Sequence, residues 1–340
     1  MKRKIALRKH STTFNLSLIF MVLAFIGISL LMSIRIEPNS MPPSGVPTQT
    51  RIPTATSTPV HLPATIEEVR STCSQGECVQ ACISHVDDEF RGENFATPYY
   101  SADDVTLVYY GIKDDELVKP RRLKVSADLI PLQLNVNAHR NIWDYFRTII
   151  PTESRPHLVQ FVFYASSTSD GLYDETLYED WLMYYNILAR QDASTMTDIL
   201  IHEYGHYMTL NRTQLDLEGI GCDQAYIHGC RKADSYLYLF YLQFWKDIYS
   251  EWDAINHDSK DYEKDIELFY DKYKDRFINQ YASTDPVEDI AESWNAFIVQ
   301  PTPSTNSIAG QKIKFFYQFP ELVELRYQII KGICTYKQAS

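Results

Sequence analysis

Two histidines and a glutamate in the stretch TMTDILIHEYGHYMTL, residues 195–210, have the residue types and spacing of a metal site. His202 and His206 are four residues apart, so on an α-helix their imidazoles share one face and can converge on a single divalent ion. Glu203 projects beside that ion, where it can take a proton from a metal-bound water. The pattern H-E-x-x-H therefore predicts zinc chemistry with Glu203 as general base, as in a zinc peptidase.

The neighbouring residues favour a helix at this position. Thr195 can act as the N-cap, with Asp198 three residues further on as in a capping box. The alternative interpretation is a chance pentapeptide in an ordinary buried helix. Apolar side chains can pack the remaining faces of the helix, namely Ile199, Leu200, Ile201, Tyr204 and Tyr207.

A catalytic zinc keeps three protein ligands and one open position for water, so a third ligand is needed. The metzincin arrangement would place glycine at 209 and histidine at 212. The sequence has Thr209 and Arg212 instead, which excludes that class. Four candidates lie in the loop that follows the helix, namely Asp216, Glu218, Asp223 and His228.

The segment QYASTDPVEDIAESWNAFI, residues 280–298, offers better candidates. Thr284 or Asp285 can cap a helix that has a proline in its first turn, where proline is tolerated. On that helix Glu288 and Glu292 are four apart and share a face. One carboxylate can ligate the zinc, and the other can orient a ligand histidine from behind.

The pairing of HEYGH with the later YASTDPVEDIAESW resembles the gluzincin branch of the zincin metallopeptidases. It is similar in particular to lethal-factor-like and related bacterial peptidases, in which a helix reading roughly E-D-x-A-E supplies the third ligand. The resemblance covers roughly residues 195–299. It implies one zinc ion per chain, bound by His202, His206 and Glu292, with Glu203 as general base.

The resemblance also implies roles for residues around the ligands. Glu288 and Asp289 would lie behind the ligands, in contact with them rather than with the metal. Tyr281 is a candidate to hydrogen-bond the oxyanion of the tetrahedral intermediate, and Tyr204 and Tyr207 compete for that role. The departure from the family is the separation of about 85 residues between the second histidine and the glutamate helix, which leaves Glu288 open as the third ligand.

The segments that precede the metal helix are expected to include the strands that help to position the site. Residue types predict strands at 98–111, 121–129 and 157–165, and helical spacing predicts a helix at 141–150. The segment 181–187, just ahead of the metal helix, has strand character. In a zincin the sheet edge at this point commonly binds an extended substrate by strand addition, and we expect that role for this segment.

The second half of the chain is predominantly helical. We expect one apolar, aromatic core helix at 233–255 and a solvated outer helix at 262–277. One or two closing helices are expected at 313–333. The expected fold is α+β and zincin-like, with a β-rich front portion at 66–165 and a catalytic portion at 166–340.

The N-terminus predicts a membrane anchor. A basic segment at 1–13 precedes an uncharged apolar run at 14–33, which is long enough to cross a bilayer. No convincing small-x-small site follows, so we expect an uncleaved signal anchor with a cytoplasmic tail; the alternative is cleavage and secretion. Residues 34–65 are rich in Pro, Thr and Ser and predict a disordered linker, which leaves 66–340 as an extracytoplasmic domain.

The cysteines agree with an external location. All six follow the apolar run, and an external compartment permits disulfides. Cys222 and Cys230 flank a short loop and are the simplest pair to propose. A cysteine metal site is the weaker alternative, because the spacing lacks a matching partner group. We expect Cys334 to pair with one of the three early cysteines, Cys73, Cys78 or Cys82.

Composition limits the function classes. The net charge of -12 comes from acidic residues scattered among basic ones, which argues against a nucleic-acid surface. We therefore expect a membrane-anchored, extracytoplasmic zinc peptidase that acts on peptides or proteins. The alternative is a non-catalytic zincin-fold surface protein that binds a protein or the cell wall. A site that had lost its activity would be expected to have lost at least one of its three key residues, and His202, Glu203 and His206 are all present.

Overall fold

The structure, a computed structural model, describes most of the chain after residue 60, within the unit His61–Ser340. The expected membrane anchor at 14–33, its cytoplasmic tail and most of the linker lie outside the described residues. In the described part, no helix is both long and apolar enough to span a bilayer. The described residues are 61–74, 76–90, 104–167, 171–175, 180–189, 192–216, 225–226, 229–304 and 306–338.

A five-stranded mixed sheet, with strand order β2-β1-β3-β5-β4, forms one part of this unit. β1 pairs antiparallel with β2 and β3, and β5 pairs parallel with β3. β4 pairs antiparallel with β5 and forms an edge of the sheet. The strands are β1 Val105–Lys113, β2 Glu116–Arg122, β3 Leu158–Ala165, β4 Gly171–Glu175 and β5 Trp181–Asn186.

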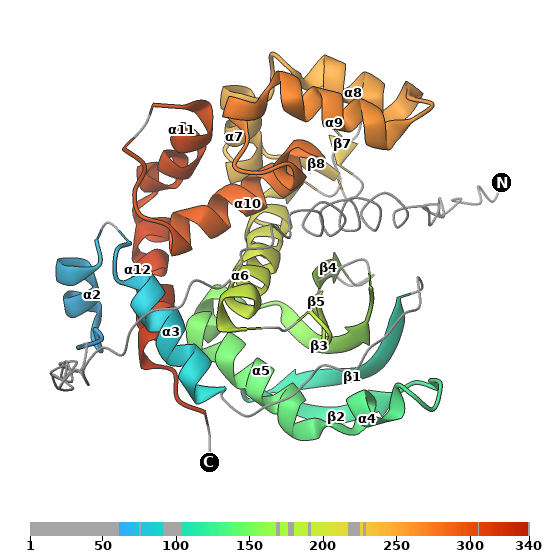
Figure 1. Ribbon diagram of the computed structural model, residues 1–340, viewed down its shortest axis with the longest axis vertical. Coiled ribbons are helices and arrows are strands. Elements are labelled where there is room, and N and C mark those ends of the chain that lie inside the picture. Colours follow the sequence, from blue (N-terminus) through green and yellow to red (C-terminus); the bar gives the residue numbers. More distant parts are fainter. Residues whose placement is uncertain are drawn as a thin grey trace, which may run out of the picture. The chain divides into compact units, whose positions relative to one another are not determined.

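Helices pack around the sheet and make up most of the second half, and Figure 1 shows α6 between the sheet and α10. α6 contacts β4 as well as α10. This arrangement confirms the expected α+β class and the mostly helical C-terminal half. The helices are α2 Ile66–Thr72, α3 Val79–Glu89, α4 Ile130–Leu134, α5 Val136–Ile149, α6 Ala193–Leu210, α7 Tyr236–Phe244, α8 Tyr249–Asp258, α9 Tyr262–Lys272, α10 Pro286–Val299, α11 Ile308–Phe315 and α12 Pro320–Thr335.

Short elements complete the described unit. A second sheet of three short strands has the order β6-β8-β7 and follows α6 in the chain. The remaining elements are β6 Leu215–Asp216, β7 Ala225–Tyr226, β8 Gly229–Arg231 and the 3-10 helices η1 Thr152–Ser154, η2 Lys274–Arg276, η3 Tyr281–Ser283 and η4 Phe316–Gln318.

Two of the predicted strands are confirmed, and both are mostly buried. The expected strands at 157–165 and 181–187 are β3 and β5. The prediction at 121–129 is wrong, because β2 begins early, directly after a tight turn at Asp114 and Asp115 with positive φ angles of 52° and 63°. The expected edge role of 181–187 is also wrong, since β5 lies between β3 and β4 and the edge strand is β4.

The helix predictions are confirmed for 141–150 and for the closing helices, which are α5, α11 and α12. The front portion, expected to be β-rich, also contains α2 to α5. The expected single helix at 233–255 is two helices, α7 and α8, with a turn at 245–248. That turn contains neither glycine nor proline, so no local signal marks the break.

One disulfide joins the two ends of the described unit, and another closes a short turn near its start. Cys82 on α3 is bonded to Cys334 on α12, and Cys73 is bonded to Cys78 across the turn between α2 and α3. The expected pairing of Cys334 with an early cysteine is thereby confirmed. Cys230 is also disulfide-bonded, and its expected partner Cys222 lies outside the described residues.

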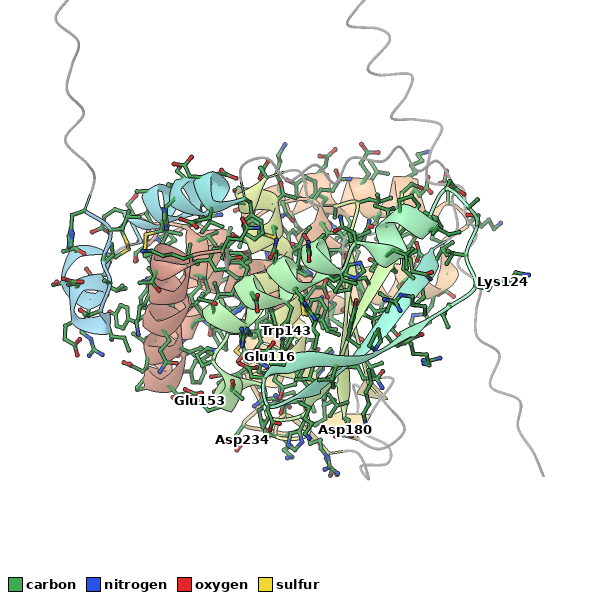
Figure 2. The ribbon with its side chains drawn as sticks, turned by 90° about the horizontal axis from the view of Figure 1, so that it is seen from below. Glu116, Lys124, Trp143, Glu153, Asp180 and Asp234 are labelled. Carbon is green, nitrogen blue, oxygen red and sulfur yellow. A yellow bond between two sulfur atoms is a disulfide. The ribbon has the colours of Figure 1, made fainter. Side chains whose placement is uncertain are left out.

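α5 packs its apolar face on the sheet. Trp143, labelled in Figure 2, is buried and donates its indole N–H to the carbonyl oxygen of Asp115 in the β1–β2 turn, at 3.1 Å. His139, one turn earlier, is fully buried and stacks on Phe163 at 4.2 Å between ring centroids. Its Nε2 lies 3.0 Å from the Leu132 carbonyl oxygen, so that nitrogen carries the proton.

His139 is held neutral by this environment. The hydroxyl of Tyr110 lies 2.9 Å from Nδ1, and burial lowers the pKa of the imidazole from 6.5 to about 4. A histidine with a lowered pKa contributes its full stability above the unfolded value of 6.5. As the pH falls from there toward 4, the unfolded chain takes up a proton that the folded chain does not.

We therefore expect the wild type to lose about 2 kcal/mol more unfolding free energy between pH 7 and pH 4.5 than the variant His139→Gln. Glutamine keeps a donor and an acceptor but does not titrate, and all other titrating groups are common to both proteins. Urea unfolding at the two pH values measures the difference. Equal losses in the two proteins would contradict the assignment.

Candidate metal centre

The site depends on a close approach of α6 and α10, which contact each other directly (Figure 1). Gly205, inside the HEYGH motif, lies at this contact. A Cβ at that position would be 3.1 Å from the Trp294 side chain and 3.2 Å from Ala291 Cα. The glycine therefore allows the histidine face of α6 to approach the glutamate face of α10 closely.

Each of the two helices begins at a polar cap. Asp192 accepts the backbone N–H of Thr195 at 2.7 Å and is the N-cap of α6, so the expected cap at Thr195 is wrong by three residues. Thr195 lies inside the first turn of α6, which begins at Ala193. Asp285 caps α10 as expected, accepting from Val287 N at 2.7 Å with Pro286 directly after it.

Three ligand atoms converge between the helices. The Nε2 atoms of His202 and His206 are 3.0 Å apart, and Oε2 of Glu288 lies 3.2 Å from each of them. Zinc ligands at bond lengths of about 2.0–2.1 Å in a tetrahedron are separated by about 3.3–3.4 Å. The three atoms thus have nearly the spacing of one face of a zinc coordination sphere, and the donor set of two imidazoles and a carboxylate suits zinc.

Glu292 lies behind His202. Its Oε1 is 2.8 Å from His202 Nδ1, and its Oε2 accepts the side-chain N–H of Asn279 at 2.7 Å. A carboxylate on Nδ1 holds the imidazole in the tautomer whose Nε2 lone pair is available to a metal. In the structure, Glu288 lies beside the two Nε2 atoms, and Glu292, the ligand that the resemblance implies, lies beside Nδ1 of His202.

The different positions of the two glutamates have a geometric reason. Glu288 and Glu292 share a face of α10, one turn apart, and both reach His202, but on opposite sides of its ring. Which of the two meets the Nε2 side is decided by how far α10 is shifted along α6. Sequence spacing contains no information on that shift.

The electrostatics of the group favour a cation. Burial alone would lower the pKa of His202, but the carboxylates of Glu288 and Glu292 raise it to about 10. Burial would raise the pKa of Glu288, but His206 and His202 hold it well below its usual range. Glu203, 5% exposed, adds a third carboxylate to the same region. Positive charge is therefore stabilised at the point where the three ligand atoms meet.

Tyr281 is brought to the group, as expected. It lies in η3, with its ring centroid 5.9 Å from that of His202. Partial burial and the carboxylates of Glu288 and Glu203 raise the pKa of its hydroxyl. The competing tyrosines are bound elsewhere: Tyr204 donates to the Ser154 carbonyl oxygen at 3.0 Å, and Tyr207 accepts from His157 N at 3.4 Å.

Asp289 does not lie behind the metal ligands, and that expectation is wrong. Adjacent residues on a helix point about 100° apart, so Asp289 leaves the face that Glu288 uses. Its Oδ2 accepts from Lys312 Nζ at 2.5 Å and from Trp245 Nε1 at 2.7 Å. Both charged side chains are fully buried. Asp289 therefore links α10 to α11 from a flank of α10 and does not contact the histidines.

Some relevant residues had no sequence signal. Asn279 binds Glu292 and also accepts the backbone N–H of Ala282 at 2.9 Å, so it links the glutamate to the turn that carries Tyr281. Gly171 of β4 lies against Glu203. Among the earlier candidates for the third ligand, Asp216 is described and does not join the group, and the others lie outside the described residues.

The fold and the site together define a mixed α+β protein with a His-His-Glu group that could hold a metal ion. Comparison with known proteins adds nothing to this definition. No protein-family model matches the chain, and neither a curated protein nor a solved structure is significantly similar to it.

The positions of the two glutamates predict different zinc affinities. Glu288→Ala should weaken zinc binding by more than 100-fold, because it removes a ligand. Glu292→Gln should weaken it by about 10–100-fold, the usual effect of an outer hydrogen-bond partner. Competition with a chromogenic chelator measures both, with Glu267→Gln on the exposed face of α9 as the control. A larger loss in the Glu292 variant would instead make Glu292 the third zinc ligand, as the resemblance implies.

The buried pair predicts a stability effect without a metal effect. Asp289→Asn leaves the Lys312 ammonium buried without a counter-charge, so the unfolding free energy should fall by about 3–5 kcal/mol. Zinc stoichiometry in the folded variant should not change. Adding Lys312→Met should recover much of the loss, as measured by urea unfolding. An additive, larger loss in the double variant would show that the pair is not the cause.

Proposed function

We propose that the chain is a zinc-dependent peptidase with a zincin-like fold. The observation that carries the proposal is the convergence of the His202 and His206 Nε2 atoms with the Glu288 carboxylate, next to the buried Glu203. The packing of α6 on an antiparallel edge strand supports the fold assignment. The donor set and its spacing fit zinc, and His202, His206 and Glu288 would hold it.

Zinc bound there would polarise a scissile carbonyl and lower the pKa of a bound water. The chain's own residues supply the remaining steps. Glu203 takes the proton from the attacking water and passes it to the leaving amine. Tyr281, at the exposed side of the group, donates a hydrogen bond to the oxyanion that forms on the substrate carbonyl. Glu292 and Asn279 keep the His202 ring oriented throughout.

The substrate we propose is an extended stretch of peptide or protein. β4 is an edge strand that pairs with β5 on one side and contacts α6, the helix that carries the histidines. An extended chain can add to such an edge through backbone hydrogen bonds, which would place a peptide bond beside the metal group. β4 thereby takes the role expected at first for 181–187.

An extracytoplasmic location, with residues 14–33 as a membrane anchor, is part of the proposal. The bond between Cys82 and Cys334 and that between Cys73 and Cys78 support it, because such structural disulfides persist in oxidising compartments. The membrane anchor itself rests on the sequence alone.

The test is the variant Glu203→Gln. It should hydrolyse peptides at least 100-fold more slowly than the wild type while binding one zinc ion, because general acid–base catalysis typically contributes that much or more. A digest of a proteome-derived peptide library, read by mass spectrometry, compares the two proteins, with Glu267→Gln as the control. Full activity in Glu203→Gln would contradict the mechanism. A zinc-loaded wild type that cuts nothing would favour the non-catalytic binding protein.

A further inference from the structure

The first residue of the edge strand touches the side chain of the general base. Gly171 begins β4, which packs against α6. A Cβ built on Gly171 would lie 2.5 Å from Oε1, 2.6 Å from Cγ and 2.7 Å from Cδ of Glu203. These are the three nearest atoms, so the Glu203 side chain occupies the space that any other residue at 171 would fill.

The backbone of β4 does not itself require glycine. Gly171 is not among the described residues with positive φ, so its conformation is open to other amino acids. Gly111, in β1 of the same sheet, shows the ordinary case: a Cβ there would lie 3.6 Å from the Val118 side chain, which is normal van der Waals contact. The reason for glycine at 171 is therefore the neighbouring glutamate.

The glutamate cannot make room by a small adjustment. The close contacts reach from Cγ to Oε1, so nearly the whole side chain has to rotate rather than its tip alone. Glu203 is 5% exposed and is flanked in the motif by His202, whose ring is held from both sides by Glu288 and Glu292. A methyl group at 171 would thus turn the carboxylate away from its position beside the ligands.

We propose that Gly171 is a positioning residue, whose missing side chain holds the Glu203 carboxylate in place for proton transfer. This inference rests on the proposed peptidase function. It assigns a catalytic purpose to the start of β4 that is separate from substrate binding by the edge of the same strand.

The test compares Gly171→Ala with the matched control Gly111→Ala in the zinc-loaded, full-length chain. With a peptide from the library digest, kcat of Gly171→Ala should fall by about 10–100-fold, the effect of misplacing a reacting group by about 1 Å. Zinc content, KM and the melting temperature should match those of Gly111→Ala. A kcat equal to that of the control would overturn the inference.

A double-mutant cycle shows whether the effect passes through Glu203. Glu203→Asp shortens the side chain by one methylene and withdraws it from residue 171. In that background Gly171→Ala should lower kcat by less than about 3-fold, because interacting sites are not additive. The same factor in both backgrounds would point to a general structural effect and overturn the inference.

A crystal structure of zinc-loaded Gly171→Ala gives a readout that needs no activity. It should show the Glu203 side chain rotated and the histidine rings unmoved, and an unmoved Glu203 would overturn the inference.

The experiments distinguish failure of the role proposed for Gly171 from failure of the proposed peptidase function. If Glu203→Gln is inactive and Gly171→Ala behaves like Gly111→Ala, only the role of Gly171 is lost. If Glu203→Gln keeps full activity, the peptidase mechanism is lost and the role of Gly171 with it.

Discussion

The close contact between α6 and α10 is the constraint on which the site depends. Each helix alone presents only part of the His-His-Glu group that could hold a metal ion: His202 and His206 lie on one, Glu288 on the other. Ligand atoms must come within about 3.3–3.4 Å of one another to share a zinc ion, so the backbones must lie near each other. Gly205 against Ala291 and Trp294 provides that approach, and a larger residue at 205 would separate the two halves.

Contact alone does not fix which face of α10 meets the histidines. A neighbouring flank of the helix, about 100° from Glu288, carries Asp289, paired with Lys312 and Trp245 in the core. A rotation of one residue about the helix axis would break this pair and leave two charges buried, which is costly. The aromatic core around Lys312 and the glutamates beside the histidines are thus consequences of the same orientation.

Local patterns predicted the parts of the site that lie within one helix. Histidines four apart share a face on any helix, and Asp285 followed by proline marks the start of α10, so both were legible in the sequence. The positions of Glu288 and Glu292 against His202 are not legible in the sequence, because they depend on the position of one helix along another. The α+β class was also predictable, whereas the edge position of β4 was not, since strand order is set by tertiary pairing.

The same distinction explains Gly171 and Asn279. Neither belongs to a recognisable pattern, and each matters only because the fold brings it to a glutamate on another element. The break between α7 and α8 is similar, since packing interrupts an apolar run that is continuous in the sequence. The features that the sequence does not predict are therefore those that depend on contacts between separate helices and strands.

In the proposed site, His202, His206 and Glu288 bind one zinc ion. Zinc-edge X-ray absorption spectroscopy of the purified, full-length chain tests it most directly. The account predicts one zinc per chain with two imidazole nitrogens at about 2.0–2.1 Å, carboxylate or water oxygens at about 2.0–2.2 Å and no sulfur. The loss of one oxygen-ligand contribution in Glu288→Ala would complete the assignment. Fewer than two imidazoles, or sulfur at about 2.3 Å, would contradict it.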